Sequence, residues 1–334
     1  MLKKFAAVLM IIIGIMFSGI TSGKKMSILQ NQPLFKLSVD TFGTKHIINI
    51  NGVSLITDMD SSGQSETSLP INHLMRSGVN SLEIYVFPDK PEQAINHNAR
   101  AKIVLSVASN TTPGDRINIA DIVFQGGYDE LEESVLNSTK SGKVDSANKF
   151  NKDKNGDTEI YDIDFLPVNN YKGAVKLVRK INVPSTLPLW AFFNSDDLPD
   201  FDSMTDDLYY KEVEGLLSVY LEVQSALENR NVESVMNIFK ERNAELDSAF
   251  YQPKGTYDKK ISESLTDAAN DDGLELVELK KEYVNFTVED NKKLTSLTRD
   301  DFKPAISFNF KTGSGSQNYP LIFRLYNGSW ILTR

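Results

Sequence analysis

The sequence contains no cysteine in its 334 residues and has only three histidines and two tryptophans. Without cysteine the chain cannot form a disulfide, a thiolate nucleophile or a zinc–thiolate site, or carry a lipid on a cysteine. The histidines, His46, His73 and His97, have no partner at the spacing of two or four residues that is typical of metal ligands. We therefore predict no histidine-ligated metal site, and we assign no cofactor.

Motifs for nucleophilic catalysis and phosphate binding are also missing. The chain has no Gly-x-Ser-x-Gly and no Ser-x-x-Lys motif, and the glycine-rich stretch 313–316 lacks the lysine of a phosphate-binding loop. We expect that stretch to be a flexible connection between two strands. The 45 acidic residues do not reveal a catalytic pair, because a glycosidase pair is defined by a separation in space of about 5–9 Å. We assign no catalytic residue.

Basic residues are too few and too scattered for a polyanion. The only runs noted are Lys259-Lys260 and Lys292-Lys293. The 36 basic residues include Lys3 and Lys4, so a chain that lacks its first 23 residues has 34 basic and 45 acidic residues and a net charge of −11. Nucleic acid and anionic lipid both require clustered Lys and Arg, so we expect neither as a partner.

The N-terminus has the order of a secretory signal peptide. Lys3-Lys4 precedes an apolar run from Phe5 to Ile20, and the small residues Thr21-Ser22-Gly23 follow it. Sixteen residues are short for a bilayer core of about 30 Å, which favours cleavage near Gly23 over a retained anchor. No later segment is apolar enough to span a membrane. We predict a signal peptide at 1–23 and a mature protein in the periplasm or outside a bacterial cell.

Two halves with different patterns follow the signal peptide. Short alternating runs predict strands near 35–39, 48–50, 82–86, 103–107, 117–124, 160–165, 174–183 and 189–193. Such spacing is typical of an all-β sandwich, either a jelly roll or an immunoglobulin-like fold, which we place at 24–195. An aspartate-rich segment at 196–207 is the predicted linker. It is interpreted as solvated, with a divalent-cation site as the alternative.

The second half, 208–334, has the pattern of an α+β domain, with helices packed on a curved antiparallel sheet. The stretch 203–206 has the form of a capping box, and Asn231 is placed to cap a second helix. Helical spacing predicts helices within 209–227, 232–250 and 257–268, and alternation predicts strands near 284–288, 306–310, 321–325 and 330–332. Asn-Gly pairs predict tight turns at Asn51-Gly52 and at Asn327-Gly328.

Two segments resemble known folds. The stretches 50–53, 70–74 and 78–84, with their Asn-Gly and Gly-x-Asn turns, resemble jelly-roll domains of the galactose-binding type. That likeness implies a fold rather than sugar binding. The stretch 226–242 and the closing Asn-Gly-x-Trp-x-Leu strand resemble the nuclear-transport-factor-like cone, and a cystatin-like sheet has nearly the same pattern. The combination is similar in type to immunity or inhibitor proteins of the cell envelope.

One loop has the spacing of an EF-hand calcium site. Oxygen-bearing side chains occupy positions one, three, five, nine and twelve of 151–162, with Gly156 at position six. Thr158 stands at a position that should be apolar, and the flanking sequence predicts strand rather than helix. We expect a polar hairpin tip. If calcium binds, its ligands are the side chains of Asp153, Asn155, Asp157 and Asp162.

Three functions follow from these patterns. The first is a non-catalytic binding protein, inhibitor-like or immunity-like, whose target is another protein. The second is a carbohydrate-binding or envelope accessory protein, which should expose aromatic side chains such as Trp190 and Tyr85. The third is an enzyme that uses a cavity of the second half, with Tyr220, Arg242 and Glu245 as the named residues. Aromatic bulk at Trp190, Phe192 and Phe193 is expected on both faces of a strand, and Trp330 is expected in the core.

Overall fold

The computed structural model describes residues 28–60, 63–111, 116–126, 159–168, 171–280, 284–299, 303–313 and 315–334. The predicted signal peptide and most of the calcium-type loop lie outside these residues. Contacts between Cα atoms divide the chain into two compact units, Met1–Leu189 and Trp190–Arg334. We call them the first and the second unit.

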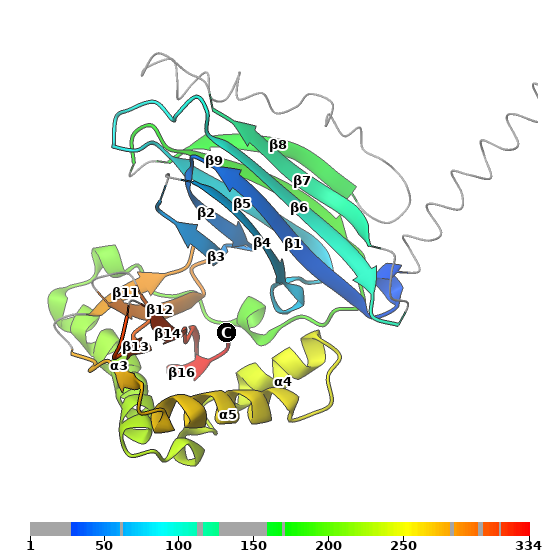
Figure 1. The fold of residues 1–334 in the computed structure, drawn as a ribbon. Helices are drawn as coiled ribbons and strands as arrows, with labels where there is room; N and C mark the ends of the chain where they lie inside the picture. Colours follow the sequence, from blue (N-terminus) through cyan, green and yellow to red (C-terminus); the bar gives the residue numbers. More distant parts are fainter. Residues whose placement is uncertain are drawn as a thin grey trace, which may run out of the picture. The chain divides into compact units, whose positions relative to one another are not determined.

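The first unit consists of antiparallel strands in two sheets (Figure 1). One sheet has the order β4-β1-β6-β7 and the other the order β3-β2-β5-β9-β8. Their bounds are β1 Pro33–Phe42, β2 Lys45–Ile50, β3 Val53–Asp58, β4 Gln64–Pro70, β5 Gly78–Phe87, β6 Arg100–Ser109, β7 Ile117–Gln125, β8 Glu159–Pro167 and β9 Val175–Val183. A short 3₁₀ helix, η1, spans Asn72–Leu74.

The alternation of the sequence decides which side chains enter the core of the first unit. In β1 every second residue from Pro33 to Thr41 is buried, because successive side chains of a strand point to opposite faces. Central strands such as β5 are buried more completely, with Leu82, Ile84 and Val86 fully enclosed. The runs that predicted these strands are therefore confirmed, whereas β3 and β4 were missed. Both have largely exposed or half-buried side chains and show little apolar alternation.

Buried asparagines connect the turns of the first unit. The Asn51 side chain donates to the Leu74 carbonyl (2.7 Å) and to Asn80 Oδ1 (2.9 Å), and it accepts from the Ser81 N–H (2.9 Å). Asn72 accepts from the Phe35 N–H at 2.6 Å and donates to the Pro33 carbonyl at 2.7 Å. We call Asn51, Asn72 and Asn80 the amide network. It joins the three stretches on which the galactose-binding-type resemblance rests.

The second unit combines three helices and two antiparallel sheets, and α4 and α5 pack on each other (Figure 1). The helices are α3 Asp206–Glu228, α4 Lys240–Ala249 and α5 Thr256–Asn270, and the 3₁₀ turns are η3 Ala191–Asn194, η4 Phe201–Ser203 and η5 Val232–Val235. The sheets have the orders β10-β13-β14 and β11-β12-β15-β16. Their strands are β10 Leu274–Leu276, β11 Val284–Val288, β12 Leu294–Arg299, β13 Ile306–Phe310, β14 Ser316–Tyr319, β15 Phe323–Tyr326 and β16 Ser329–Leu332.

A single apolar cluster fills the second unit. It takes Leu216, Tyr220 and Val223 from α3, together with Val235, Phe239 and residues of α5 and of both sheets. The Tyr220 hydroxyl donates to the Leu321 carbonyl and accepts from the Leu297 N–H at 3.0 Å. Tyr220 therefore ties α3 to the sheet.

Several local predictions for the second unit are wrong. The stretch 189–193 is not a strand, because Ala191–Asn194 forms the 3₁₀ turn η3. The helix α3 begins after Thr205 and has no side-chain cap, and Ser203 Oγ donates instead to the Asp200 carbonyl. The predicted helix 232–250 is divided into η5 and α4 by a turn. The strands β10, β12 and β14 were missed, and the connection 313–316 joins β13 to β14.

Candidate functional site

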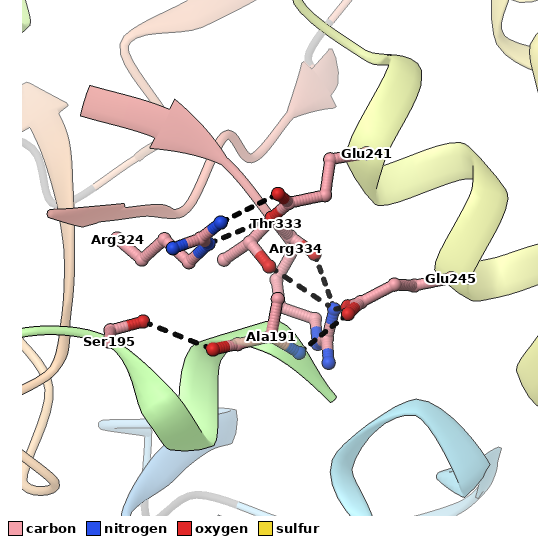
Figure 2. Close-up of polar contacts among 7 residues, drawn as sticks. All are labelled: Ala191, Ser195, Glu241, Glu245, Arg324, Thr333 and Arg334. Carbon is pink, nitrogen blue, oxygen red and sulfur yellow. Dashed lines mark hydrogen bonds and ion pairs between the residues drawn. The ribbon is translucent and has the colours of Figure 1, made fainter. Parts of the chain in front are cut away.

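Charged side chains gather where α4 meets the last strands of the second unit. Glu241 and Glu245 are one helical turn apart on α4 and therefore lie on the same face. Arg324 comes from β15, and Arg334 follows β16. Figure 2 shows both arginines pointing toward the two glutamates. We call Glu241, Arg242, Glu245, Arg324 and Arg334 the charged cluster.

Arg324 and Glu241 form a two-pronged ion pair (Figure 2). Arg324 Nε donates to Glu241 Oε1 at 2.8 Å, and Arg324 Nη2 donates to Glu241 Oε2 at 2.7 Å. Hydrogen bonding to Glu241 raises the pKa of Arg324 above its ordinary value. The Tyr326 ring lies 4.9 Å from the guanidinium carbon. The outer edge of this guanidinium is therefore fully used by one carboxylate.

Arg334 is bound in a different way. Its Nη1 donates to Glu245 Oε2 and to the Thr333 carbonyl, and the Phe192 ring lies 4.5 Å from its guanidinium carbon. The side chain is only 3% exposed. Its Nε and Nη2 are buried and have no hydrogen-bond partner among the described residues. Burial lowers the pKa of Arg334, and the nearby Glu245 opposes that shift.

Glu245 holds the turn η3 beside Arg334 (Figure 2). Its Oε1 accepts from the Ala191 N–H at 2.6 Å while Oε2 accepts from Arg334. Ser195 Oγ donates to the Ala191 carbonyl at 3.4 Å. Both oxygens of this carboxylate are therefore engaged, so Glu245 is not a free base.

Arg242 adds a third cation to the cluster. Its Nη1 donates to Asn243 Oδ1 at 2.9 Å, and Asn243 donates in turn to Asp258 Oδ1 at 2.8 Å. Its Nε has no hydrogen-bond partner within the described part of the chain. Burial, followed by the like charge of Arg334, lowers the pKa of Arg242 to about 10. The group therefore stays charged at neutral pH, and the cluster is suited to hold an oxyanion.

A second candidate is an open pocket of about 430 Å³, which we call the aromatic pocket. Its lining is largely apolar, with one acid and one base at its edge: Leu198, Pro199, Asp200, Phe201, Tyr209, Phe286, Val288 and Lys292. The Phe201 and Phe286 ring centroids are 4.4 Å apart, and Trp330 lies edge-on to Phe286 at 6.1 Å. The pocket lies entirely within the second unit.

The aspartate-rich segment forms one wall of this pocket. The Leu198 N–H donates to the Lys292 carbonyl at 2.7 Å, and Lys293 Nζ contacts Asp197 Oδ1 at 2.8 Å. The Asn327 N–H donates to Asp196 Oδ2 at 3.0 Å. Hydrogen bonding to Lys293 lowers the pKa of Asp197. The start of the segment that we predicted as a linker, 196–207, is thus attached to the second unit.

The residues named for an enzyme do not form one site. Arg242 and Glu245 belong to the charged cluster, but the Tyr220 hydroxyl is buried and both of its hydrogen bonds go to backbone. Burial raises the pKa of Tyr220 well above its ordinary value. Val235 and Phe239 are buried in the apolar cluster. Tyr220 is therefore a packing residue.

The aromatic predictions have mixed outcomes. Trp190 is 2% exposed and Phe192 is buried, while Phe193 is half-buried and stacks on Phe192 with ring centroids 4.1 Å apart. Tyr85 is half-buried beneath the Lys176 ammonium at 4.6 Å. Trp330 is partly buried and packs against the core of the second unit. Trp190 and Tyr85 therefore do not form an exposed platform.

The metal-site predictions have little structure to test them. Asp153, Asn155 and Asp157 lie outside the described residues, and so does the side chain of Asp162. His46 is buried and contacts Thr44, and His73 lies in η1. Within the described ranges no group of three His, Asp or Glu side chains is arranged to hold a metal ion.

Sequence reasoning missed Arg324, Arg334, Phe201 and Phe286 as site residues. Arg324 stands next to Phe323 in a strand, where alternation predicts an outward-facing side chain, and no motif distinguishes it from a surface arginine. Comparison with known protein families, with curated proteins and with solved structures finds no match for this chain. None of the helices in the described ranges is both long enough and apolar enough to cross a bilayer.

Proposed function

We propose that this chain is an exported, non-catalytic protein that binds another protein in the periplasm or outside the cell, as an inhibitor or an immunity-like protein does. The observation that carries the proposal is the aromatic pocket. It is open, and it lies close in sequence to the large exposed apolar residues Leu208, Tyr210 and Val288. Apolar pockets with exposed aromatic and aliphatic side chains are typical of binding sites.

Charge indicates what kind of partner fits. The chain is acidic, with a net charge of −9, and the pocket wall carries Asp197 and Asp200. Opposite charge on a partner accelerates encounter and disfavours wrong partners. The proposed ligand is therefore a protein segment that inserts an apolar side chain and carries basic residues around it.

The finer architecture supports the same proposal. The two sheets of the first unit are proposed to form a sandwich of the jelly-roll or immunoglobulin type, because each sheet alternates buried and less buried side chains. The second unit is proposed to be a nuclear-transport-factor-like or cystatin-like α+β domain. Both are scaffolds on which binding surfaces recur without a shared chemistry.

A paired capture experiment tests the proposal. Tagged full-length chain is used to recover proteins from envelope extract, alongside Val288→Asp in the pocket lining and Leu166→Asp as the matched control. Val288 is 37% exposed and Leu166, on β8 of the first unit, is 46% exposed. We expect the wild type and Leu166→Asp to recover the same protein and Val288→Asp to lose it. Recovery of no protein, or equal recovery by Val288→Asp, would contradict the proposal.

Export has a separate test. The N-terminal residue of the protein from the extracytoplasmic fraction of its cells should lie near Lys24 if the segment 1–23 is removed. A protein that retains Met1 and stays in the cytoplasm would refute export while leaving the pocket proposal to the capture experiment.

A further inference from the structure

Two arginines of the charged cluster present the same edge, and only one of these edges is occupied. Arg324 uses Nε and Nη2, which lie side by side on the guanidinium, to hold both oxygens of Glu241. Arg334 has the same two donors buried, with no acceptor among the described residues. The first arginine therefore shows what the second edge is suited to hold.

The neighbours of Arg334 cover its other sides. Phe192 lies over the ring face, and Nη1 is committed to Glu245 and Thr333. Glu245 cannot turn to the free edge without giving up the Ala191 N–H. Buried polar groups in proteins are nearly always hydrogen-bonded, and a charged donor without an acceptor is strongly disfavoured. The free edge therefore calls for an acceptor from outside the cluster.

The balance of charge indicates that the acceptor is an anion. Arg324 and Arg334 each face one glutamate, but the contacts of Arg242 are to the neutral amide of Asn243. The cluster therefore has three cations and two carboxylates. An added negative group would meet Arg334 directly and would also be attracted by Arg242, whose charge acts on Arg334.

We infer that the Nε–Nη2 edge of Arg334 binds the carboxylate of a small molecule. A planar carboxylate matches two parallel N–H donors, and Glu241 on Arg324 is the example within this protein. The ligand is small because the edge is buried. This site lies on α4, β15 and the end of the chain, and it does not use the aromatic pocket that the proposed function rests on.

Thermal unfolding in the presence of simple anions tests the inference. Acetate and malonate are titrated into the full chain, and sodium chloride at matched ionic strength serves as the reference. Both tryptophans, Trp190 and Trp330, lie in the second unit, so their fluorescence follows the unit that contains the site. We expect a rise in unfolding temperature that saturates with acetate or malonate, because a ligand that binds only the folded state stabilises it.

Arg334→Lys is the decisive variant, because it keeps the charge beside Glu245 but lacks the two-donor edge. We expect it to lose most of the saturable rise. Arg230→Lys, at an arginine whose side chain is 60% exposed, should retain the rise. No saturable rise with either carboxylate, or an equal rise in Arg334→Lys, would overturn the inference. A rise with inorganic phosphate alone would also contradict it, since the edge would then hold a tetrahedral anion.

A direct measurement covers the case in which Arg334→Lys does not fold. Nuclear magnetic resonance of arginine Nε–H groups in the wild-type chain should show one signal that moves on addition of malonate, which we expect to be Arg334. The Arg324 signal should stay in place because Glu241 already occupies its edge. Movement of neither signal, or of exposed arginines only, would overturn the inference.

Discussion

The two units contain the same turn and use it for different purposes. Asn51-Gly52 joins β2 to β3, and Asn327-Gly328 joins β15 to β16, with positive φ at all four residues. Both turns were predicted from the Asn-Gly pair and both are confirmed. Asn51 also sends its side chain into the amide network, whereas at Asn327 the printed bond is from the backbone N–H to Asp196.

The contrast extends to the polar groups around each turn. Neutral amides join the turns of the first unit, and the donors and acceptors described for Asn51 and Asn80 are paired with one another or with backbone. The second unit instead brings together three arginines and two glutamates, and some of the guanidinium N–H groups lack a partner among the described residues. A satisfied network needs no ligand to explain it, while an unsatisfied one points to binding.

The largest expected effect comes from breaking the amide network without disturbing its turn. Asn51→Gly keeps the positive φ, which glycine adopts freely, but removes three hydrogen bonds made by the side chain. At about 1 kcal/mol for each bond, we expect the free energy of unfolding to fall by about 3 kcal/mol. Urea unfolding followed by circular dichroism measures the loss.

Asn327→Gly is the matched control for that experiment. We expect a change within about 0.5 kcal/mol, because glycine also suits that backbone and the bond to Asp196 comes from the backbone N–H. Equal losses in the two variants would mean that the turn, rather than the amide network, determines stability.

A smaller effect is expected from the ion pair of the second unit. Glu241→Gln leaves the Arg324 guanidinium, with a side chain 7% exposed, without its carboxylate. Removing one partner of a fully buried pair costs about 3–5 kcal/mol. Because the Glu241 side chain is 30% exposed, we expect a loss of about 2 kcal/mol, measured by tryptophan fluorescence in urea. Asp272→Asn, at an exposed pair with Arg230, should change stability very little.

The smallest predicted effect concerns alkaline pH. The tyrosines whose pKa is raised by burial, among the described residues, all lie in the second unit: Tyr220, Tyr251, Tyr257 and Tyr319. Burial raises the pKa of Tyr251 to about 12, whereas an unfolded tyrosine titrates near 10. Between these values the unfolded chain binds fewer protons, so stability falls as pH rises through this range and is unaffected below it.

Tyr251→Phe should reduce the loss of stability between pH 9 and pH 11, as followed by thermal unfolding. Tyr210→Phe serves as the control because Tyr210 is 54% exposed. If the wild type and Tyr251→Phe lose the same stability over this range, the burial of Tyr251 does not contribute to the alkaline sensitivity of the chain.

Much of the architecture was predictable because local chemistry determines it. The alternation in β1 and the Asn-Gly turns depend on neighbouring residues alone. The strand β4 was missed because its side chains are mostly exposed and leave no apolar period. The turn η3 was mistaken for a strand because Trp190 and Phe192 are buried by the second unit without any alternation along the chain.

The charged cluster was predicted only in part, and its missing members have a physical reason. Arg242 and Glu245 were named from α4, but Arg324 and Arg334 are 83 and 89 residues away from their partners along the chain. Only the paired strands β15 and β16 bring them to the helix. Pairing at that separation leaves no signal in a single sequence. The aromatic pocket likewise joins residues near 200 to residues near 286, which no motif connects.

The account's central claim is that recognition of a partner takes place on the second unit, at the aromatic pocket. Hydrogen exchange of the full chain, with and without the protein recovered in the capture experiment, tests it most directly. We predict that binding slows exchange of backbone amides at 198–201, 208–210 and 286–292 and leaves the amide network of the first unit unchanged. Protection confined to strands of the first unit, with none around Phe201 and Phe286, would contradict the claim.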